Sequence, residues 1–263
     1  GRLEASETGN TDVMVFHGST DAPRVDVAEP FEQLTLVDNL SYGSFTEGYL
    51  GLATSDYQLQ IQNEFGSQAV AQFGAPLETL GLEDSALVVV ASGFLDSTVN
   101  SNGPAFGLYA ALPSGGEMVE LPASDVSQAM VQVIHNSADA AASTVDVWLN
   151  DAPLLDDFAF RTASPFVALT AGTNLDVSIQ PSSSTDTVDA LAKFRYQLLP
   201  DEKYVLVASG LVSSSGYDPI EPFDIDVFQG RRTAASQIGN TDVLGYQGEI
   251  QAPTRTLEIT VRP

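Results

Sequence analysis

The sequence contains no cysteine, which excludes a disulfide framework and thiolate metal sites and leaves the redox compartment open. It also lacks any apolar run approaching the roughly 20 residues that span a bilayer, so we expect no membrane insertion. Residues 1–4 are polar and form no apolar core of a signal peptide. A start at glycine fits either a processed, mature chain or one trimmed artificially at this end.

Positive charge is scarce. The chain has 35 acidic and 10 basic residues, a net charge of −25, and its only lysines are Lys193 and Lys203. Such a surface repels nucleic acid and anionic lipid, so neither is an expected partner. It suits either a saline, halophilic setting or simply an acidic extracellular surface, and both interpretations stay open. At low salt we expect self-repulsion to cost stability, because screening weakens as the Debye length grows.

One sequence motif begins three times along the chain. Residues 11–27 contain a His-Gly-Ser-Thr-Asp-Ala-Pro run followed by Val-Asp-Val, and residues 130–147 repeat the pattern with two extra residues before Val-Asp-Val. A third copy starts at Gly239, where residues 239–243 reproduce the Gly-Asn-Thr-Asp-Val of residues 9–13. The spacing of the first two copies fits one β-sandwich domain of about 100 residues each. The third copy is expected to be incomplete.

Periodicity along the chain is almost entirely that of strands. Residues 57–62 alternate between polar and apolar, residues 87–91 are continuously apolar and β-branched, and Gly-, Pro- and Asn-rich turns separate such stretches. The pattern predicts an all-β protein of two tandem immunoglobulin-like antiparallel β-sandwich domains with a C-terminal strand segment. The expected organisation is a flexible lead-in (1–10), a first sandwich (11–112), a linker or shared strand (113–129), a second sandwich (130–238) and an incomplete third repeat (239–263).

The motif at residues 17–27 resembles the signature of the domain-of-unknown-function family 4397. Further matching features are Tyr49, the alternating residues 57–61 and the Val-Val-Ala-Ser-Gly at 89–93. The second unit is similar through residues 135–147 and 207–210, although residues 141–144 replace the Pro-x pair. The resemblance covers roughly residues 9–112 and 128–230. It implies secreted or surface-attached bacterial and archaeal proteins, often with tandem copies, and it implies no enzymatic activity.

The histidines of the motif invite a catalytic interpretation, because each is followed by an aspartate four residues later. The structural interpretation is that the imidazole and carboxylate hydrogen-bond a turn. The third copy has Gln247 at the histidine position, which can hydrogen-bond but cannot act as a base, so we favour the structural interpretation and expect no catalytic residue. The residues expected to stabilise the repeated motif are His17, Asp21, Asp26, His135, Asp139 and Asp146.

No motif for a serine nucleophile, a zinc protease or a phosphate-binding loop is present. Asp151, Asp156 and Asp157 cluster near a turn, and oxygen ligands suit Ca²⁺, but acidic clusters arise by composition alone in so acidic a chain. We therefore expect no metal site and no cofactor, with calcium as the one alternative. Trp148 is expected to pack in the core between the two sheets.

The start of the third copy suggests assembly. Residues 241–247 and 256–261 are predicted strands, and an isolated two-stranded piece is marginal in water. These strands either fold back onto the second sandwich, begin a further domain, or add to a sheet edge of a neighbouring molecule. In a donated strand, alternation places Leu257, Ile259 and Val261 on one face. The predicted assembly strand comprises Thr256, Leu257, Glu258, Ile259, Thr260 and Val261.

The sequence thus predicts a non-enzymatic extracellular or cell-surface protein, secreted, that forms a filament or surface layer. The expected partner is the protein itself in a head-to-tail homopolymer, with other surface proteins or glycans as further possibilities. The alternative is a monomeric adhesion or ligand-binding module that uses aromatic loop residues such as Tyr42, Tyr49 and Tyr217. A secreted hydrolase is a third class, and only this interpretation predicts that His17→Gln abolishes turnover while leaving the fold intact.

Overall fold

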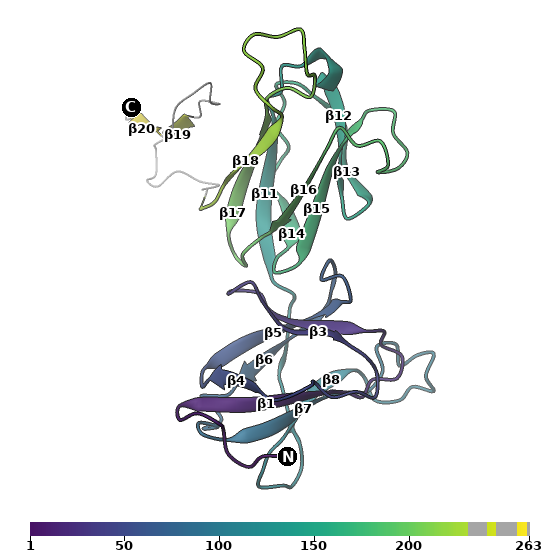
Figure 1. Cartoon of the computed structure of the whole chain (residues 1–263), viewed down its shortest axis with the longest axis vertical. Helices are drawn as coiled ribbons and strands as arrows, with labels where there is room; N and C mark the ends of the chain where they lie inside the picture. Colours follow the sequence, from purple (N-terminus) through teal and green to yellow (C-terminus); the bar gives the residue numbers. More distant parts are fainter. Residues whose placement is uncertain (231–240, 246–256, 262–263) are drawn as a thin grey trace. The chain divides into compact units, whose positions relative to one another are not determined.

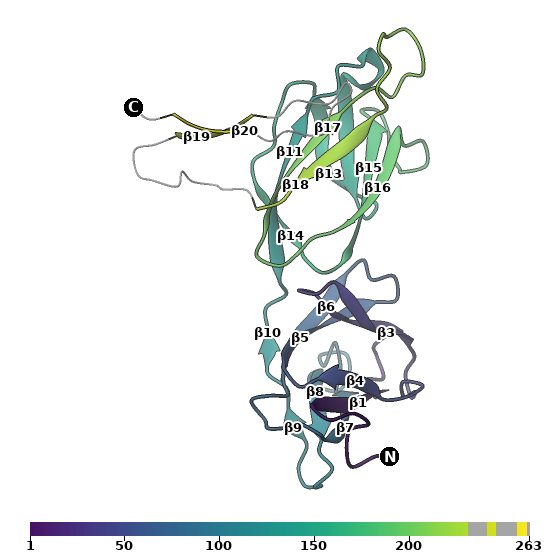
Figure 2. The same cartoon turned by 60° about the vertical axis from the view of Figure 1, so that its left-hand side comes forward.

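The computed structural model describes residues 1–230 and the two strands Thr241–Gly245 and Leu257–Val261. The chain divides into two compact units (Figures 1 and 2). Unit 1 comprises Gly1–Ser127 with Thr170–Asn174 and Gln197–Pro200, and unit 2 comprises Gln128–Leu169, Leu175–Tyr196 and Asp201–Pro263. The described residues contain one helical turn, η1 (Ala140–Ala142), and none of their helices has the length and apolar character to cross a bilayer.

Unit 1 consists of two five-stranded sheets. The first has the order β4-β1-β7-β8-β9, formed by Leu50–Ala53, Asn10–His17, Ala86–Ser92, Gly107–Ala111 and Val119–Glu120. The second has the order β10-β6-β5-β2-β3, formed by Ala123–Ser124, Ala69–Pro76, Asp56–Asn63, Val25–Glu29 and Leu34–Leu40.

Unit 2 repeats this arrangement with two four-stranded sheets. The first has the order β14-β11-β17-β18, formed by Val167–Thr170, Gln128–His135, Lys203–Ser209 and Asp224–Phe228. The second has the order β13-β12-β15-β16, formed by Ala152–Ala159, Thr144–Leu149, Asn174–Pro181 and Ala192–Gln197. Strand for strand, β11 corresponds to β1, β12 to β2, β15 to β5 and β17 to β7. The predicted all-β class with tandem sandwich-like units is therefore confirmed.

One strand pair in each unit departs from the antiparallel pattern that the sequence analysis expects. Strand β1 runs parallel to β7 from Asp12↔Ala86 to His17↔Ala91, and β11 runs parallel to β17 from Met130↔Lys203 to His135↔Ala208. Parallel neighbours need a long crossover connection, and here four strands of the second sheet of each unit lie between the two strands in the sequence. A description of the units as purely antiparallel is therefore wrong for this pair.

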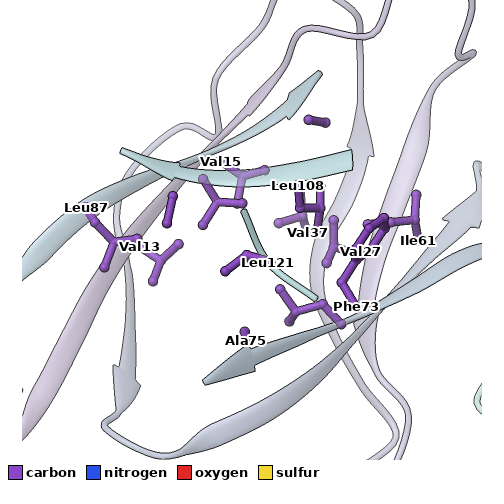
Figure 3. Packing of buried hydrophobic residues seen from close by; sticks show 14 of the residues in the cluster. Val13, Val15, Val27, Val37, Ile61, Phe73, Ala75, Leu87, Leu108 and Leu121 are labelled. Carbon is purple, nitrogen blue, oxygen red and sulfur yellow. The ribbon is translucent and has the colours of Figure 1, made fainter. Parts of the chain in front are cut away.

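The core of unit 1 lies between its two sheets (Figure 3). Alternation along β1 directs Val13 and Val15 into this core, where they meet residues of β2, β5 and β6 such as Val27, Ile61 and Phe73. Each fully buried aliphatic or aromatic side chain of this kind contributes roughly 1.5–3 kcal/mol relative to an exposed one.

The segment after β8 closes both sheets of unit 1. Strand β9 pairs with β8 through Ala110↔Val119, and β10 pairs with β6 through Ala123↔Phe73. Between β9 and β10, Leu121 is only 2% exposed and belongs to the core cluster, where Figure 3 shows it among the other buried residues. This short segment therefore covers the backbone groups of two sheet edges at once.

Near the C-terminus, β19 (Thr241–Gly245) and β20 (Leu257–Val261) form a two-stranded antiparallel sheet with pairs from Thr241↔Val261 to Gly245↔Leu257. Two strands are thus present where the sequence predicts them. Gln247 and Thr256 lie outside the described residues.

Candidate functional site

The two motif histidines are buried, each only 1% exposed. The ring Nε2 of His17 lies 2.9 Å from the Pro23 carbonyl oxygen, and that of His135 lies 2.7 Å from the Ala142 carbonyl oxygen. A carbonyl oxygen only accepts, so Nε2 carries the proton in both rings. The Ser137 N–H donates to Nδ1 of His135 at 3.3 Å, which makes this ring neutral. Burial lowers the pKa of His135 and favours the same neutral form.

The motif aspartates tie down the loop that follows the parallel strand. In unit 1, Asp21 accepts hydrogen bonds from the backbone N–H groups of Leu95 and Asp96 at 2.9 and 3.0 Å, and from the Asn100 side chain at 3.1 Å. The two backbone bonds, the one from Asp96 above all, lower the pKa of Asp21. The carboxylate thus holds the β7–β8 loop against the motif.

Asp139 holds the corresponding loop of unit 2. It accepts from the N–H and Oγ–H of Ser213 at 2.7 and 3.0 Å, from the Tyr217 hydroxyl at 3.0 Å and from the Ala141 N–H at 2.9 Å. Tyr217, expected as an exposed contact residue, therefore stabilises the loop between β17 and β18 by a hydrogen bond to Asp139. Its hydroxyl also accepts from the Ala140 N–H at 3.0 Å.

Acid is expected to destabilise unit 2 through Asp139. Burial opposes ionisation of this carboxyl, but the hydrogen bonds from Ala141, Ser213 and Tyr217 outweigh burial and lower its pKa from 3.8 to about 2. A carboxyl with a depressed folded-state pKa contributes stability that is present above the unfolded pKa and lost as the pH falls through the folded one. The midpoint temperature of thermal unfolding, followed by Trp148 fluorescence, should therefore decrease as the pH is lowered from about 4 to about 2.

The matched pair for this prediction is Asp139→Asn and Asp189→Asn, since Asp189 is an exposed carboxyl of the same unit. Asp139→Asn should lower the midpoint at neutral pH and flatten the acid part of the profile, while Asp189→Asn should follow the wild type. Parallel acid profiles for all three proteins would show that Asp139 does not couple folding to pH.

The serine and glycine positions complete the motif. Ser19 Oγ donates to the Gly93 carbonyl at 2.8 Å, and Ser137 Oγ donates to the Gly210 carbonyl at 2.7 Å. Each serine hydroxyl is thus directed at a carbonyl, each histidine Nε2 at another, and each aspartate at loop donors. A nucleophile, its base and an orienting carboxylate must contact one another in a relay. Ser19 Oγ also donates to Asp21 at 3.3 Å, but among the described residues neither histidine ring contacts a serine hydroxyl or an aspartate carboxylate.

The aspartate of Val-Asp-Val supports a bulge in the neighbouring strand. Asp26 accepts the Asn39 N–H at 2.7 Å, and Asp146 accepts the Asp157 N–H at 2.8 Å. Asn39 and Asp157 have positive φ angles of 54° and 50° at the register shift of each pair. Burial, together with nearby carboxylates, raises the pKa of both Asp26 and Asp146.

The acidic cluster differs from the one that the sequence suggests. Asp156 and Asp157 lie with Asp146, and one carboxylate oxygen from each lies within 4.8 Å of the others. Asp151 instead accepts a hydrogen bond from the Thr187 hydroxyl at 2.8 Å. Trp148 shares the face of Asp146 rather than that of Val145 and Val147, which line an apolar core cavity, so the expected core position of Trp148 is wrong.

Residues 129–224 match the family model described as "Domain of unknown function (DUF4397)". This stretch of unit 2 is similar to the DUF4397 family. The resemblance stated from the sequence is therefore confirmed for these residues. Unit 1 shares the strand order and the hydrogen-bonded motif of unit 2, while the number of family copies stays a prediction. No curated protein matches the chain.

Solved structures with some likeness to the chain include two bacterial proteins. A candidate cell adhesion protein from Bacteroides eggerthii is 12% identical, with 88% of this chain and 98% of that chain covered and a TM-score of 0.20. The fimbrial anchor protein Mfa2 from Porphyromonas gingivalis is 11% identical, with 84% and 98% covered and a TM-score of 0.22. TM-scores this low carry no argument about the chain.

Several residues that stabilise the local structure of unit 2 could not be identified from the sequence. Ser137 and Gly210 belong to the repeated motifs, but only the structure shows the hydrogen bond between them. Gln180 is fully buried in β15, directly across from Asp146 of β12. The alternating pattern of β15 offered a signal for Gln180, because it places a polar residue at the end of a strand with buried neighbours.

Proposed function

We propose that the chain is a non-enzymatic extracellular structural protein that assembles with copies of itself through its terminal β-strands. The observation that carries this proposal is the two-stranded sheet β19–β20, whose strands pair only with each other among the described strands. A two-stranded sheet is marginally stable alone, so further pairing stabilises it. Each of its strands has one backbone edge that no described strand occupies.

Donation of such a strand to another molecule is β-augmentation, in which main-chain hydrogen bonds supply affinity and alternate side chains supply specificity. The sequence of β20, Leu-Glu-Ile-Thr-Val, alternates as such a strand requires. Donor and acceptor surfaces differ, so each molecule can both give and receive, and the product is a head-to-tail polymer rather than a closed dimer. This favours a filament or a surface layer outside the cell.

The absence of catalysis is part of the proposal. Both buried imidazoles hydrogen-bond backbone carbonyls, and among the described residues neither contacts a serine hydroxyl or a carboxylate. The net charge of −25 suits a protein that remains dispersed in a salt-containing medium.

The second candidate function is that of a monomeric adhesion or ligand-binding module. Exposed apolar side chains gather near the motif of unit 1: Tyr42 lies edge-on to His17 with ring centroids 6.2 Å apart, and Phe45 lies 4.6 Å from Phe16. Tyr42 is 56% exposed and Phe45 53% exposed. Val99, 76% exposed, lies in the loop that Asp21 holds. Loops at the end of a rigid sandwich commonly carry binding residues.

The test compares the full chain with a version ending after Gly239, by sedimentation and electron microscopy at low and high salt. Assembly through the terminal strands predicts large oligomers or filaments that the truncation abolishes. A matched pair within β20 sharpens the test, because Ile259→Asp and Thr260→Asp add the same charge at neighbouring alternate positions. Ile259→Asp should abolish assembly, whereas Thr260→Asp should retain it.

Folded monomers for both the full and the truncated chain would refute assembly. A screen of glycans and surface proteins against wild type, Tyr42→Ser and Phe45→Ser would then test the adhesion module. Unfolding of the truncated chain would also refute the proposal, because the terminal strands would then belong to the fold of unit 2.

A further inference from the structure

Four oxygen-bearing side chains form a row across three adjacent strands of unit 2. Asp146 lies in β12, with Gln180 of β15 as its direct partner on one side. On the other side, Asp156 and Asp157 of β13 fill the register shift between the Val145↔Phe158 and Val147↔Leu155 pairs. Directly paired residues of antiparallel strands share a face with Cβ atoms about 4.5–5.5 Å apart, so the Gln180 amide projects beside the Asp146 carboxylate.

Gln180 is an anomaly within this row. Its exposure is 0%, and neither its Oε1 nor its Nε2 has a hydrogen-bond partner among the described residues. The indole Nε1 of Trp148, two residues from Asp146 on the same face, is likewise buried without a described partner. A buried amide that has lost its hydrogen bonds to water and has formed no others lowers the stability of the fold. Such groups therefore indicate a ligand or a bound water.

The three carboxylates of the row lie close together without a neighbouring positive charge among the described residues. Asp146 is 4% exposed, and one oxygen from each of the three groups lies within a 4.8 Å cluster. The ion pairs found among the described residues are Arg2–Asp12 and Arg195–Asp176, and neither supplies a cation here. Like charges at this separation repel, and burial of one of them removes the water that would screen it.

We propose that Asp146, Asp156, Asp157 and Gln180 bind a calcium ion. Ca²⁺ takes 6–8 oxygen ligands at about 2.3–2.6 Å and accepts both carboxylates and amide carbonyls. Asp146 uses one oxygen for the Asp157 N–H and retains the other for the ion. Asp156 and Asp157 are exposed, so water completes the coordination sphere from the solvent side. A calcium site that water completes in this way has an expected Kd on the order of 10⁻⁴–10⁻³ M, the range of extracellular modules.

Unit 1 provides a built-in comparison, because the corresponding row is Asp38 and Asn39 in β3, Asp26 in β2 and Gln62 in β5. Asn39 stands where unit 2 has Asp157, so one carboxylate is missing. Gln62 is also satisfied, since its Nε2 donates to Gln60 Oε1 at 2.6 Å. The proposal therefore assigns one ion per chain, in unit 2 alone.

The test is titration of the EGTA-treated full chain with CaCl₂ in about 0.15 M NaCl, which screens diffuse attraction to the acidic surface. Calorimetry should show one saturable site. Terbium serves as a luminescent replacement for calcium, and Trp148 is the only tryptophan in the chain. Excitation of this indole should produce terbium emission that calcium displaces, and Trp148→Phe should reduce the emission while leaving calorimetric calcium binding in place.

The matched variants are Asp156→Asn in unit 2 and Asp38→Asn at the equivalent position of unit 1. Asp156→Asn should weaken calcium binding about tenfold or more, while Asp38→Asn should leave it unchanged. Gln180→Met, which keeps the volume and removes the carbonyl, should also weaken binding. Thermal melts in EGTA establish that each variant is folded, and Asp156→Asn should melt no lower than wild type because it relieves repulsion.

Absence of saturable binding, or equal losses in Asp156→Asn and Asp38→Asn, would overturn the proposal in favour of diffuse binding of counter-ions. Unchanged affinity in Gln180→Met would remove Gln180 from the site and assign its buried amide to a bound water.

Discussion

Gly210→Ala is expected to destabilise unit 2 by about 2–5 kcal/mol. Gly210 has a φ angle of +80°, where an L-residue costs about 1–2 kcal/mol. A Cβ placed on it would also lie 2.1 Å from the Pro222 carbonyl oxygen, a backbone atom that cannot move aside without distorting the β17–β18 loop. Gly93 of unit 1 shows the same approach, with the Ala105 carbonyl oxygen at 2.1 Å.

The matched control lies in the same loop. Gly216 has a φ angle of +92° but nothing within 4 Å of its hypothetical Cβ. Gly216→Ala should therefore cost only the conformational part, about 1–2 kcal/mol. Denaturant unfolding followed by Trp148 fluorescence measures both variants, because this tryptophan lies in unit 2. Equal losses for the two substitutions would mean that the loop shifts freely and that the close approach carries no cost.

Leu121→Ala is expected to destabilise unit 1 by about 2–5 kcal/mol, the usual range for removing a buried leucine. Leu121 is 2% exposed and packs in the core from the segment between β9 and β10. Its loss leaves a cavity and also loosens the two short strands that close the sheet edges. Calorimetry should show the transition of unit 1 at lower temperature, while the Trp148 signal of unit 2 is retained.

Met118, three residues earlier and 47% exposed, gives the control for Leu121. Met118→Ala should change the free energy of unfolding by no more than about 0.5 kcal/mol, as exposed substitutions usually do. A small effect of Leu121→Ala would instead indicate that residues 119–124 are a tether rather than part of the core of unit 1.

The repeat made the architecture predictable. Two copies of one motif at a domain-length spacing, with alternating strands between them, were enough to predict two similar β-units. The direction of pairing was not predictable, because alternation along β1 and β7 is compatible with either direction. The parallel pair follows from the path of the chain through the second sheet, which no local pattern records.

The details of the motif depend on long-range contacts. The sequence predicts that Asp21 and Asp139 hydrogen-bond a turn, but their donors Leu95 and Ser213 are more than 70 residues away. The acidic cluster is a similar case: Asp151 is close to Asp156 in sequence, whereas Asp146 reaches it through the pairing of β12 with β13. Strand phase would have placed Trp148 correctly, since it is two residues from Asp146 in an alternating strand.

The central position of the first strand in each unit has a mechanical consequence. Strand β1 is flanked by β4 on one side and β7 on the other, and β11 is flanked by β14 and β17. Tension transmitted along the chain into β1 must shear two ladders of hydrogen bonds simultaneously, because the strand cannot peel away from an open edge one bond at a time. Each unit is therefore expected to resist pulling at its entry strand more strongly than it would if that strand lay at a sheet edge.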